Sequence, residues 1–150
     1  MKVFDGIAEL AAAQGTDLGA SEWVLVEQDR INQFADATGD HQWIHVDPER
    51  AKDGPFGAAI AHGFLTLSMM PVLQHELYRV DGVTMTVNYG LNKVRFVTPV
   101  RVGSRIRARA TIGDVTQLDG AVQIELHTTI EIEGSDKPAC VAVSIARFVA

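Results

Sequence analysis

The sequence predicts an α+β fold in which a curved antiparallel sheet wraps around one apolar helix. Three observations lead to this class. The first half of the chain carries apolar residues at helical spacing, the second half carries long alternating strands, and an apolar helical segment, 63–78, lies between them. Because 150 residues is the size of one ordinary domain, we expect a single domain over residues 1–150.

Two helices are predicted before this apolar segment. The first is expected near the N-terminus and ends at Gly15, because apolar residues recur there at helical spacing: Val3, Phe4, Ile7, Leu10 and Ala11. A short strand over 23–26 is expected to follow. The second helix has one apolar face, formed by Ile31, Phe34, Ala35 and Thr38, and Gly39 is expected to stop it.

The central helix is predicted to begin at Gly63 and to run to about Tyr78. It is apolar nearly all round, as expected for a helix enclosed by a sheet. Pro71 lies inside it and is expected to kink it, because proline lacks the backbone N–H of a helical hydrogen bond.

After Asp81-Gly82 the hydrophobic period changes to two, which predicts strands. Alternation over 83–89 and 93–97 is interrupted at Gly90, where we expect a bulge. Further strands are predicted over 105–112 and 122–133, with turns at 119–120 and 134–136. The last strand, 139–149, is apolar on both faces and is therefore expected to lie inside the sheet.

Composition and charge exclude several classes of function. With 47% hydrophobic and 21% charged residues, the chain is expected to fold throughout. A net charge of −6 argues against nucleic acid as a partner, since such binding needs clustered cations. The longest apolar stretch, 63–73, is too short to cross a membrane, and residues 1–10 do not resemble a signal peptide, so we expect a cytoplasmic protein. The single cysteine, Cys140, has small or apolar neighbours and is expected to be a buried packing residue.

The segment from Thr38 to His45 carries the most informative chemistry. It places Asp40 and His45 five residues apart just after a helix, where loop backbone can direct both side chains to one point. Asp47-Pro48 then predicts the capped start of a short helical turn. A carboxylate and an imidazole that hold one water molecule can act as general base and general acid. The alternative is that both residues are solvated or form only a structural hydrogen bond.

The start of the central helix is a second candidate site. Ile60-Ala61-His62-Gly63 offers no serine, threonine, aspartate or asparagine to cap the first N–H groups. Free N–H donors at a helix start can stabilise a developing oxyanion, and Gly63 allows close approach of a ligand. The alternative is that Gly63 only permits a tight turn into the helix.

Several segments in order resemble the MaoC-like, (R)-specific enoyl-CoA hydratases. The resemblance begins at Phe34 and Ala37-Thr38-Gly39-Asp40, and continues through Ile44-His45 and Ala51. It extends to Ala61-His62-Gly63-Phe64, to the run from Tyr89 to Phe96, and to Pro99-Val100 with Gly103. The chain departs from the family pattern at Gln42-Trp43, where relatives commonly have Asn-Pro.

The resemblance implies a hotdog fold, in which an antiparallel sheet wraps a long central helix, and a homodimer with active sites near the interface. It implies syn addition of water to a trans-2-enoyl thioester, giving the (R)-3-hydroxyacyl product in fatty-acid metabolism. The catalytic pair of the family falls on Asp40 and His45, and the glycine that polarises the thioester carbonyl falls on Gly63. No cofactor is implied, because coenzyme A is part of the substrate.

Other residues are candidates for substrate binding. Gln42 has an amide that can orient the pair or the substrate, Asn88 and Tyr89 can line the acyl or pantetheine channel, and Lys93 and Arg95 can hold coenzyme A phosphates. The arginines that follow at alternate positions are at least as well explained by the solvent face of a strand: Arg105, Arg107 and Arg109.

Two further points concern single side chains. Ser68 is a candidate for the serine that holds the aspartate in some relatives. The remaining histidines match no familiar metal spacing, so no metal site is predicted, although His62 adjoins the oxyanion donor and can form a structural hydrogen bond there.

Two other functions remain open at this stage. A hotdog thioesterase would direct water at the carbonyl carbon, and the pairing of Asp40 with His45 favours the hydratase over it. A non-catalytic subunit that binds acyl thioesters would have no need of both groups.

Overall fold

The structure is a computed structural model that describes residues 1–150. Its elements, in chain order, are β1 (Lys2–Asp5), α1 (Gly6–Ala11), β2 (Asp17–Ala20), β3 (Val24–Leu25), α2 (Gln28–Thr38), α3 (Trp43–Val46), α4 (Pro48–Lys52), α5 (Gly63–Ser68), α6 (Met70–Gln74), β4 (Tyr78–Asp81), β5 (Met85–Phe96), β6 (Arg105–Leu118), β7 (Ala121–Ile132) and β8 (Cys140–Val149).

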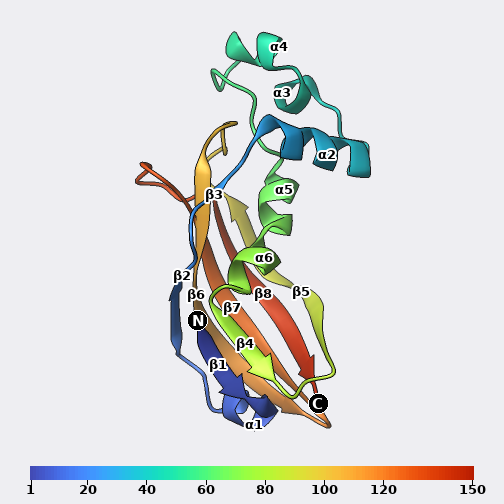
Figure 1. The fold of residues 1–150 in the computed structure, drawn as a ribbon, viewed down its shortest axis with the longest axis vertical. Helices are drawn as coiled ribbons and strands as arrows, with labels where there is room; N and C mark the ends of the chain where they lie inside the picture. The colour runs from blue at the N-terminus through green and yellow to red at the C-terminus, as the bar shows by residue number, and fades with distance from the viewer.

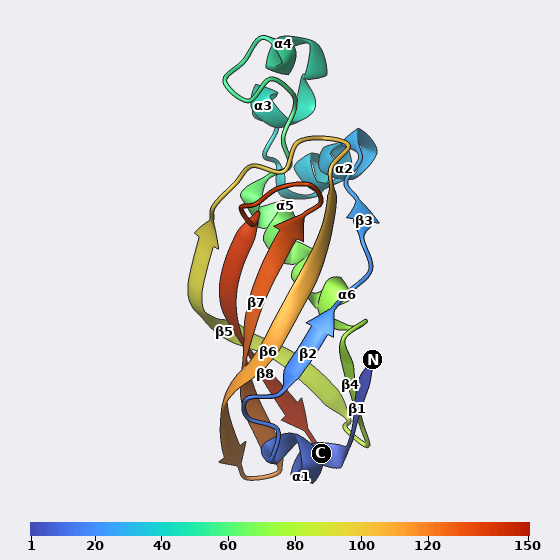
Figure 2. The same cartoon turned by 90° about the vertical axis from the view of Figure 1, so that its left-hand side faces the viewer.

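The main sheet is antiparallel and has the strand order β2-β6-β7-β8-β5, with β3 also paired to β6. Its long strands twist and curve along α5 and α6, which lie against one face (Figures 1 and 2). The predicted interior position of the last strand is confirmed, because β8 lies between β7 and β5. The turn predicted at Asp119-Gly120 joins β6 to β7, and Gly120 has a φ of 70° that suits glycine.

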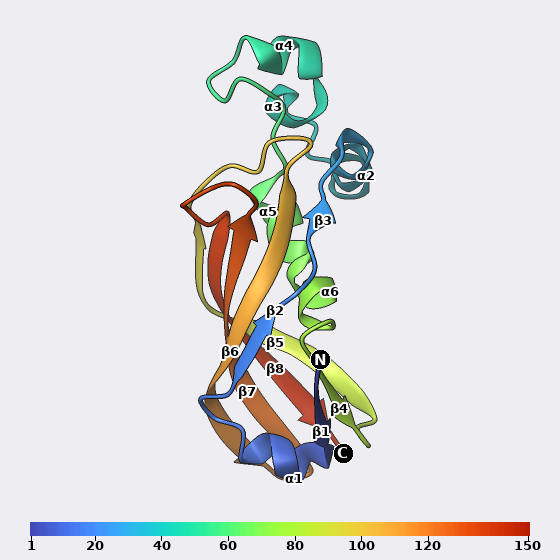
Figure 3. The ribbon, with the colours of Figure 1, turned by 60° about the vertical axis from the view of Figure 1, so that its left-hand side comes forward.

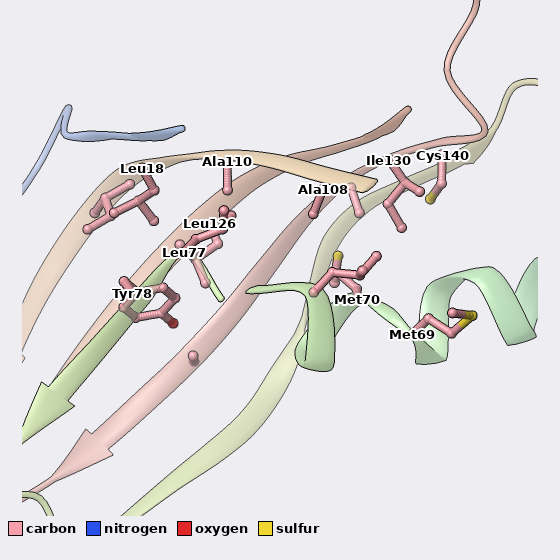
Figure 4. Close-up of a cluster of buried hydrophobic side chains, with 14 of the residues drawn as sticks. Leu18, Met69, Met70, Leu77, Tyr78, Ala108, Ala110, Leu126, Ile130 and Cys140 are labelled. Atoms are coloured by element: carbon pink, nitrogen blue, oxygen red, sulfur yellow. The ribbon is translucent and has the colours of Figure 1, made fainter. Parts of the chain in front are cut away.

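The core lies between the sheet and the helix pair. Alternate residues of β6 are buried, as predicted from the period of two: Ile106, Ala108, Ala110 and Ile112. Figure 4 shows side chains of the sheet, including Leu126, Ile130 and Cys140, facing Met69 and Met70 from the helix region. Cys140 is fully buried, and burial raises the pKa of its thiol, so its predicted packing role is confirmed.

The central helix predicted from Gly63 begins at that residue, as expected, but it does not run as one long helix to Tyr78. Two short helices, α5 and α6, follow one another and are separated at Met69. Pro71 lies at the first turn of α6, where its missing N–H costs nothing, but the same residue prevents α5 from continuing. Tyr78 begins a strand, not a last helical turn.

The N-terminal prediction also needs correction. Val3 and Phe4 lie in β1, which pairs in parallel with β4 in the register Lys2↔Tyr78 to Asp5↔Asp81. The helix begins only at Gly6 and ends at Ala11, before the predicted stop at Gly15. Helical spacing over so few residues was overridden by pairing with a strand distant in sequence.

The segment α2–α4 projects beyond the end of the sheet and lies next to the start of α5 (Figures 1 and 3). The predicted second helix is confirmed as α2, with Ile31 and Ala35 buried and Gly39 in a left-handed conformation at its C-terminus. None of the helices combines the length and the apolar character needed to cross a bilayer.

Strand β5 forms one edge of the main sheet. Its pairing with β8 shifts register between Asn88 and Gly90, which confirms the predicted bulge. Several large apolar side chains of this strand are exposed, among them Met85, Tyr89 and Leu91.

Candidate active site

The loop that carries Asp40 begins where α2 ends. Gly39 has a φ of 83° and donates its N–H to the carbonyl of Ala35 at 2.8 Å, so the chain turns sharply before Asp40. The Asp40 carboxylate is exposed and accepts a long, 3.4 Å hydrogen bond from the N–H of Gln42. At the far end of the loop, Asp47 accepts from the N–H of Arg50, which confirms the predicted cap of α4.

His45 is held from both its ring and its backbone. Its Nδ1 lies 2.7 Å from the carbonyl oxygen of Ile60, and its own carbonyl accepts from the Gln28 side chain at 2.7 Å. A carbonyl can only accept, so Nδ1 carries the proton and Nε2 keeps a free lone pair. Burial lowers the pKa of His45, so the ring is neutral at neutral pH and Nε2 is available as a base.

His62 lies against this pair. It is 2% exposed, and its Nε2 donates to the backbone carbonyl of Asp40 at 2.9 Å. Its ring stacks on the ring of His45 with centroids 3.9 Å apart and an angle of 23° between planes. Polar atoms of Asp40, His45 and His62 lie within 4.8 Å of one another, so the two predicted catalytic residues do meet.

The same three side chains include the atom types that bind metals, but their geometry suits a hydrogen-bonded pair better. Imidazole lone pairs lie in the ring plane, and the planes of His45 and His62 differ by only 23°, so the lone pairs of the two rings lie in nearly parallel planes. One nitrogen of each ring already faces a backbone carbonyl. A tetrahedral metal site needs donors that converge.

Gly63 begins α5, and the N-cap residue His62 makes no side-chain hydrogen bond to the helix start. The N–H of Gly63 has no partner, as the sequence predicted. A Cβ placed on Gly63 would lie 2.9 Å from the Phe96 ring, so the glycine permits a close approach of β5. A cavity of about 200 Å³ borders Gly63, Thr66 and Phe96, but Asp40 and His45 do not line it.

Comparison with known proteins identifies the family. Residues 9–133 match the model of the MaoC like domain. This chain belongs to the MaoC-like family. It is 60% identical over 151 residues to 3-hydroxyacyl-thioester dehydratase Z of Mycobacterium tuberculosis, a match that covers 100% of both chains.

Solved structures share the architecture of this MaoC-like domain. A monoamine oxidase regulatory protein from Archaeoglobus fulgidus has a TM-score of 0.80 at 24% identity, covering 99% of this chain and 96% of that one. The (R)-hydratase from A. caviae involved in PHA biosynthesis has a TM-score of 0.71 at 20% identity, covering 89% and 94%. The predicted hotdog fold is therefore confirmed, apart from the long central helix.

The predicted binding residues of the MaoC-like domain are spread over separate regions. Asn88 and Tyr89 line a cavity of about 390 Å³ between α5–α6 and strands β5 and β8, away from the cavity beside Gly63. Lys93 and Arg95 are exposed on β5 and line neither cavity. Gln42 caps α3 with its backbone and stays next to Asp40. The single chain does not gather these residues into one pocket.

The outer arginines of the MaoC-like domain form ion pairs on the solvent face of the sheet, one of the two roles that the sequence left open for them. Arg107 and Arg109 both contact Glu131 of β7, and Arg105 contacts Glu133, just after the end of β7. Arg107, the nearest of them, is the main cause of the lowered pKa of Glu131. Ser68, a possible counterpart of the serine found in some relatives, makes no hydrogen bond to Asp40; its hydroxyl donates to the carbonyl of Phe64 within its own helix.

Sequence reasoning missed two residues that hold the site. Gln28 fixes the backbone of His45, and the carbonyl of Ile60 fixes its ring. Both contacts join segments 15 or more residues apart, and neither residue type signals such a contact from the sequence alone.

Proposed function

We propose that this chain is an (R)-specific hydratase of trans-2-enoyl-CoA, or the same enzyme working in reverse as a 3-hydroxyacyl-thioester dehydratase. The observation that carries the proposal is that the Asp40 carboxylate lies within 4.8 Å of a ring nitrogen of His45, a buried, neutral histidine whose Nδ1 is already hydrogen-bonded to a carbonyl. The dehydratase name of the relative that is 60% identical supports the same chemistry.

The pair accounts for both proton transfers of the reaction. One group removes a proton from water while the water oxygen bonds to the β-carbon of the substrate. The electron pair of the double bond moves onto the thioester oxygen, where the N–H of Gly63 is the donor that stabilises the charge. The protonated member of the pair then returns a proton to the α-carbon on the same face, so water is added syn and nothing else is consumed.

Substrate contacts are assigned to residues from separate regions of the chain. We assign Gln42 to orient the water or the pair, and Asn88 and Tyr89 to the acyl or pantetheine channel along α5 and α6. Lys93 and Arg95 are exposed cations on β5 and are assigned to the coenzyme A phosphates. In this proposal the reaction needs no cofactor beyond the coenzyme A of the substrate, and no metal.

A homodimer is the second part of the proposal. The outer edge of β5 has no neighbouring strand, and its exposed apolar side chains are typical of a strand that pairs with another chain. Pairing two copies through β5 would also cover the cavities that border this strand.

The decisive experiment compares Asp40→Asn and His45→Gln with wild type in crotonyl-CoA hydration. Each variant removes a proton acceptor while keeping size, so we expect kcat to fall by about 10²- to 10⁴-fold with folding retained. Asp36→Asn and His41→Gln are matched controls, because this neighbouring pair has the same chemistry at 2.9 Å but is exposed. Near wild-type turnover in both site variants would refute the assignment.

Product analysis separates the alternatives. Chiral chromatography should show (R)-3-hydroxybutyryl-CoA as the product. Release of free thiol in its place would identify a thioesterase, and substrate binding without turnover by the wild-type chain would identify a non-catalytic subunit.

A further inference from the structure

His62 does not stabilise the start of the helix that it precedes. It occupies the N-cap position of α5 but makes no side-chain hydrogen bond to the N–H groups there. Its Nδ1 is buried and has no hydrogen-bond partner. A serine or an aspartate would satisfy the helix start without burying an unpaired nitrogen, so the residue is explained better by another task.

The hydrogen bonds of the two buried histidines are reciprocal. His45, in α3, donates from Nδ1 to the carbonyl of Ile60, in the segment that leads into α5. His62, in that segment, donates from Nε2 to the carbonyl of Asp40, at the start of the loop. The two rings stack between these bonds, and Phe34 of α2 packs on His62 with ring centroids 4.9 Å apart.

This crossed pair joins the two halves of the site. The segment 40–45, which runs into α3, carries the proposed acid and base, and the next residue after His62 is Gly63, the proposed oxyanion donor. Apart from the His62 bond, Asp40 is held only by the long hydrogen bond to its own carboxylate from Gln42. The backbone position of Asp40 relative to Gly63 therefore depends on His62.

We propose that His62 is a positioning residue, which fixes the distance between the water-activating pair and the start of α5. The proposal rests on the function proposed above. His62 touches neither water nor substrate in this role, and it acts through the backbone of Asp40 and the ring of His45. Pre-organised placement of reacting groups accounts for large rate factors, and a misplacement of about 1 Å can cost about 100-fold.

Two variants separate the contribution of the His62 hydrogen bond from that of the stacked ring. His62→Phe keeps an aromatic ring for stacking but has no donor, whereas His62→Gln keeps a terminal N–H at the reach of Nε2 but loses the ring. We expect kcat of His62→Phe to fall about 100-fold with KM within about threefold, since binding contacts are untouched. His62→Gln should recover at least about tenfold of that loss.

The control is His75→Phe, which makes the same exchange at an exposed histidine at the end of α6. Wild-type kcat in folded His62→Phe would overturn the proposal. Equal losses in His62→Phe and His62→Gln would also overturn it, because they would assign the effect to packing and not to the donated bond.

A second readout does not depend on turnover. Amide hydrogen exchange over residues 40–45 should be faster in His62→Phe than in wild type and close to wild type in His62→Gln. Unchanged exchange in His62→Phe would refute the role. If wild type failed to hydrate crotonyl-CoA, the proposed function would fall, yet this exchange measurement would still decide whether His62 fixes the loop. Should His62→Phe not fold, His62→Gln and His62→Leu allow the same comparison.

Discussion

At the scale of single residues, the site depends on one buried imidazole kept neutral. Desolvation is the largest influence on His45 and lowers its pKa, while its hydrogen bond to the carbonyl of Ile60 opposes that shift. The stacked ring of His62 lowers the pKa further, and Asp40 raises it. The net result is a histidine whose base form survives at a pH where an exposed histidine is already half protonated.

The pH dependence of activity follows from this shift. As pH falls, kcat/KM should stay level through 6.5, the ordinary pKa of histidine, and decrease only at lower pH, where His45 takes up a proton. A pH–rate profile with crotonyl-CoA measures this limb. A decrease centred above pH 6.5 would contradict a neutral, desolvated His45.

The lowered pKa of His45 should also make the free energy of unfolding depend on pH. The unfolded chain protonates His45 at the ordinary pKa, and the folded chain does so only at a lower pH. The unfolded state therefore binds more protons in between, and the contribution of His45 to the free energy of unfolding is intact above pH 6.5 and decreases below it.

The sequence was sufficient to single out the proposed catalytic residues, but not the residues that hold them in place. Asp40 and His45 are close in sequence and follow a helix stop at Gly39, so local rules predicted that they lie near each other, although His45 lies in α3 and not in the loop. Their convergence depends on Ile60 and His62, which the chain brings back from the entry to α5. No local sequence pattern predicts that the segment before α5 packs against the segment 40–45.

At the scale of elements, strands were predicted better than helices. When one face of a segment is buried, a hydrophobic period of two residues indicates a strand, and burial in β6 and β7 follows this period closely. An apolar run without clear period does not define helix length. The apolar run after Gly63 is divided by Pro71 into two short helices. Its last residue, Tyr78, begins β4 and pairs with Lys2 of β1, a pairing that no sequence pattern indicates.

The contact between α5 and β5 can be tested at Gly63. Its φ is not in the left-handed region, so Gly63→Ala is tolerated by the backbone, but the new methyl group would lie 2.9 Å from the Phe96 ring. We expect kcat for crotonyl-CoA to fall by about 10- to 100-fold as the helix start is displaced.

Making room should reverse this loss. Phe96→Ala in the Gly63→Ala background removes the ring that the methyl group meets, and the N–H of residue 63 is kept. The double variant should be more active than Gly63→Ala alone, measured as a double-mutant cycle with Phe96→Ala. Additive losses would show that the two residues are not coupled.

At the scale of the whole molecule, one edge of the main sheet, strand β5, has no paired neighbour on its outer side. β5 is a 12-residue strand with exposed apolar side chains, including Met85 at 55% and Leu91 at 45%. A long apolar edge of this kind invites pairing with another chain. The proposed dimer explains why the single chain leaves its predicted binding residues on β5 outside a common pocket.

The dimer predicts a specific effect of charge on this edge. Sedimentation analysis should show a dimer of 16.3 kDa chains for wild type, and Leu91→Lys should shift it toward monomer, because two copies of the edge would bring like charges together. Leu118→Lys is the matched control, since this leucine is 40% exposed at the far end of β6. A monomeric wild type at micromolar concentration would refute the dimer.

The position of Cys140 has a practical consequence for studying this molecule. The thiol lies at the start of β8, at 0% exposure, between two paired strands. A thiol-specific reagent reaches it only when the sheet separates, and there is no second sulfhydryl to confuse the reading. The rate at which Cys140 is labelled therefore reports how often the sheet opens around it. Ligands or variants can be ranked by how far they slow this labelling.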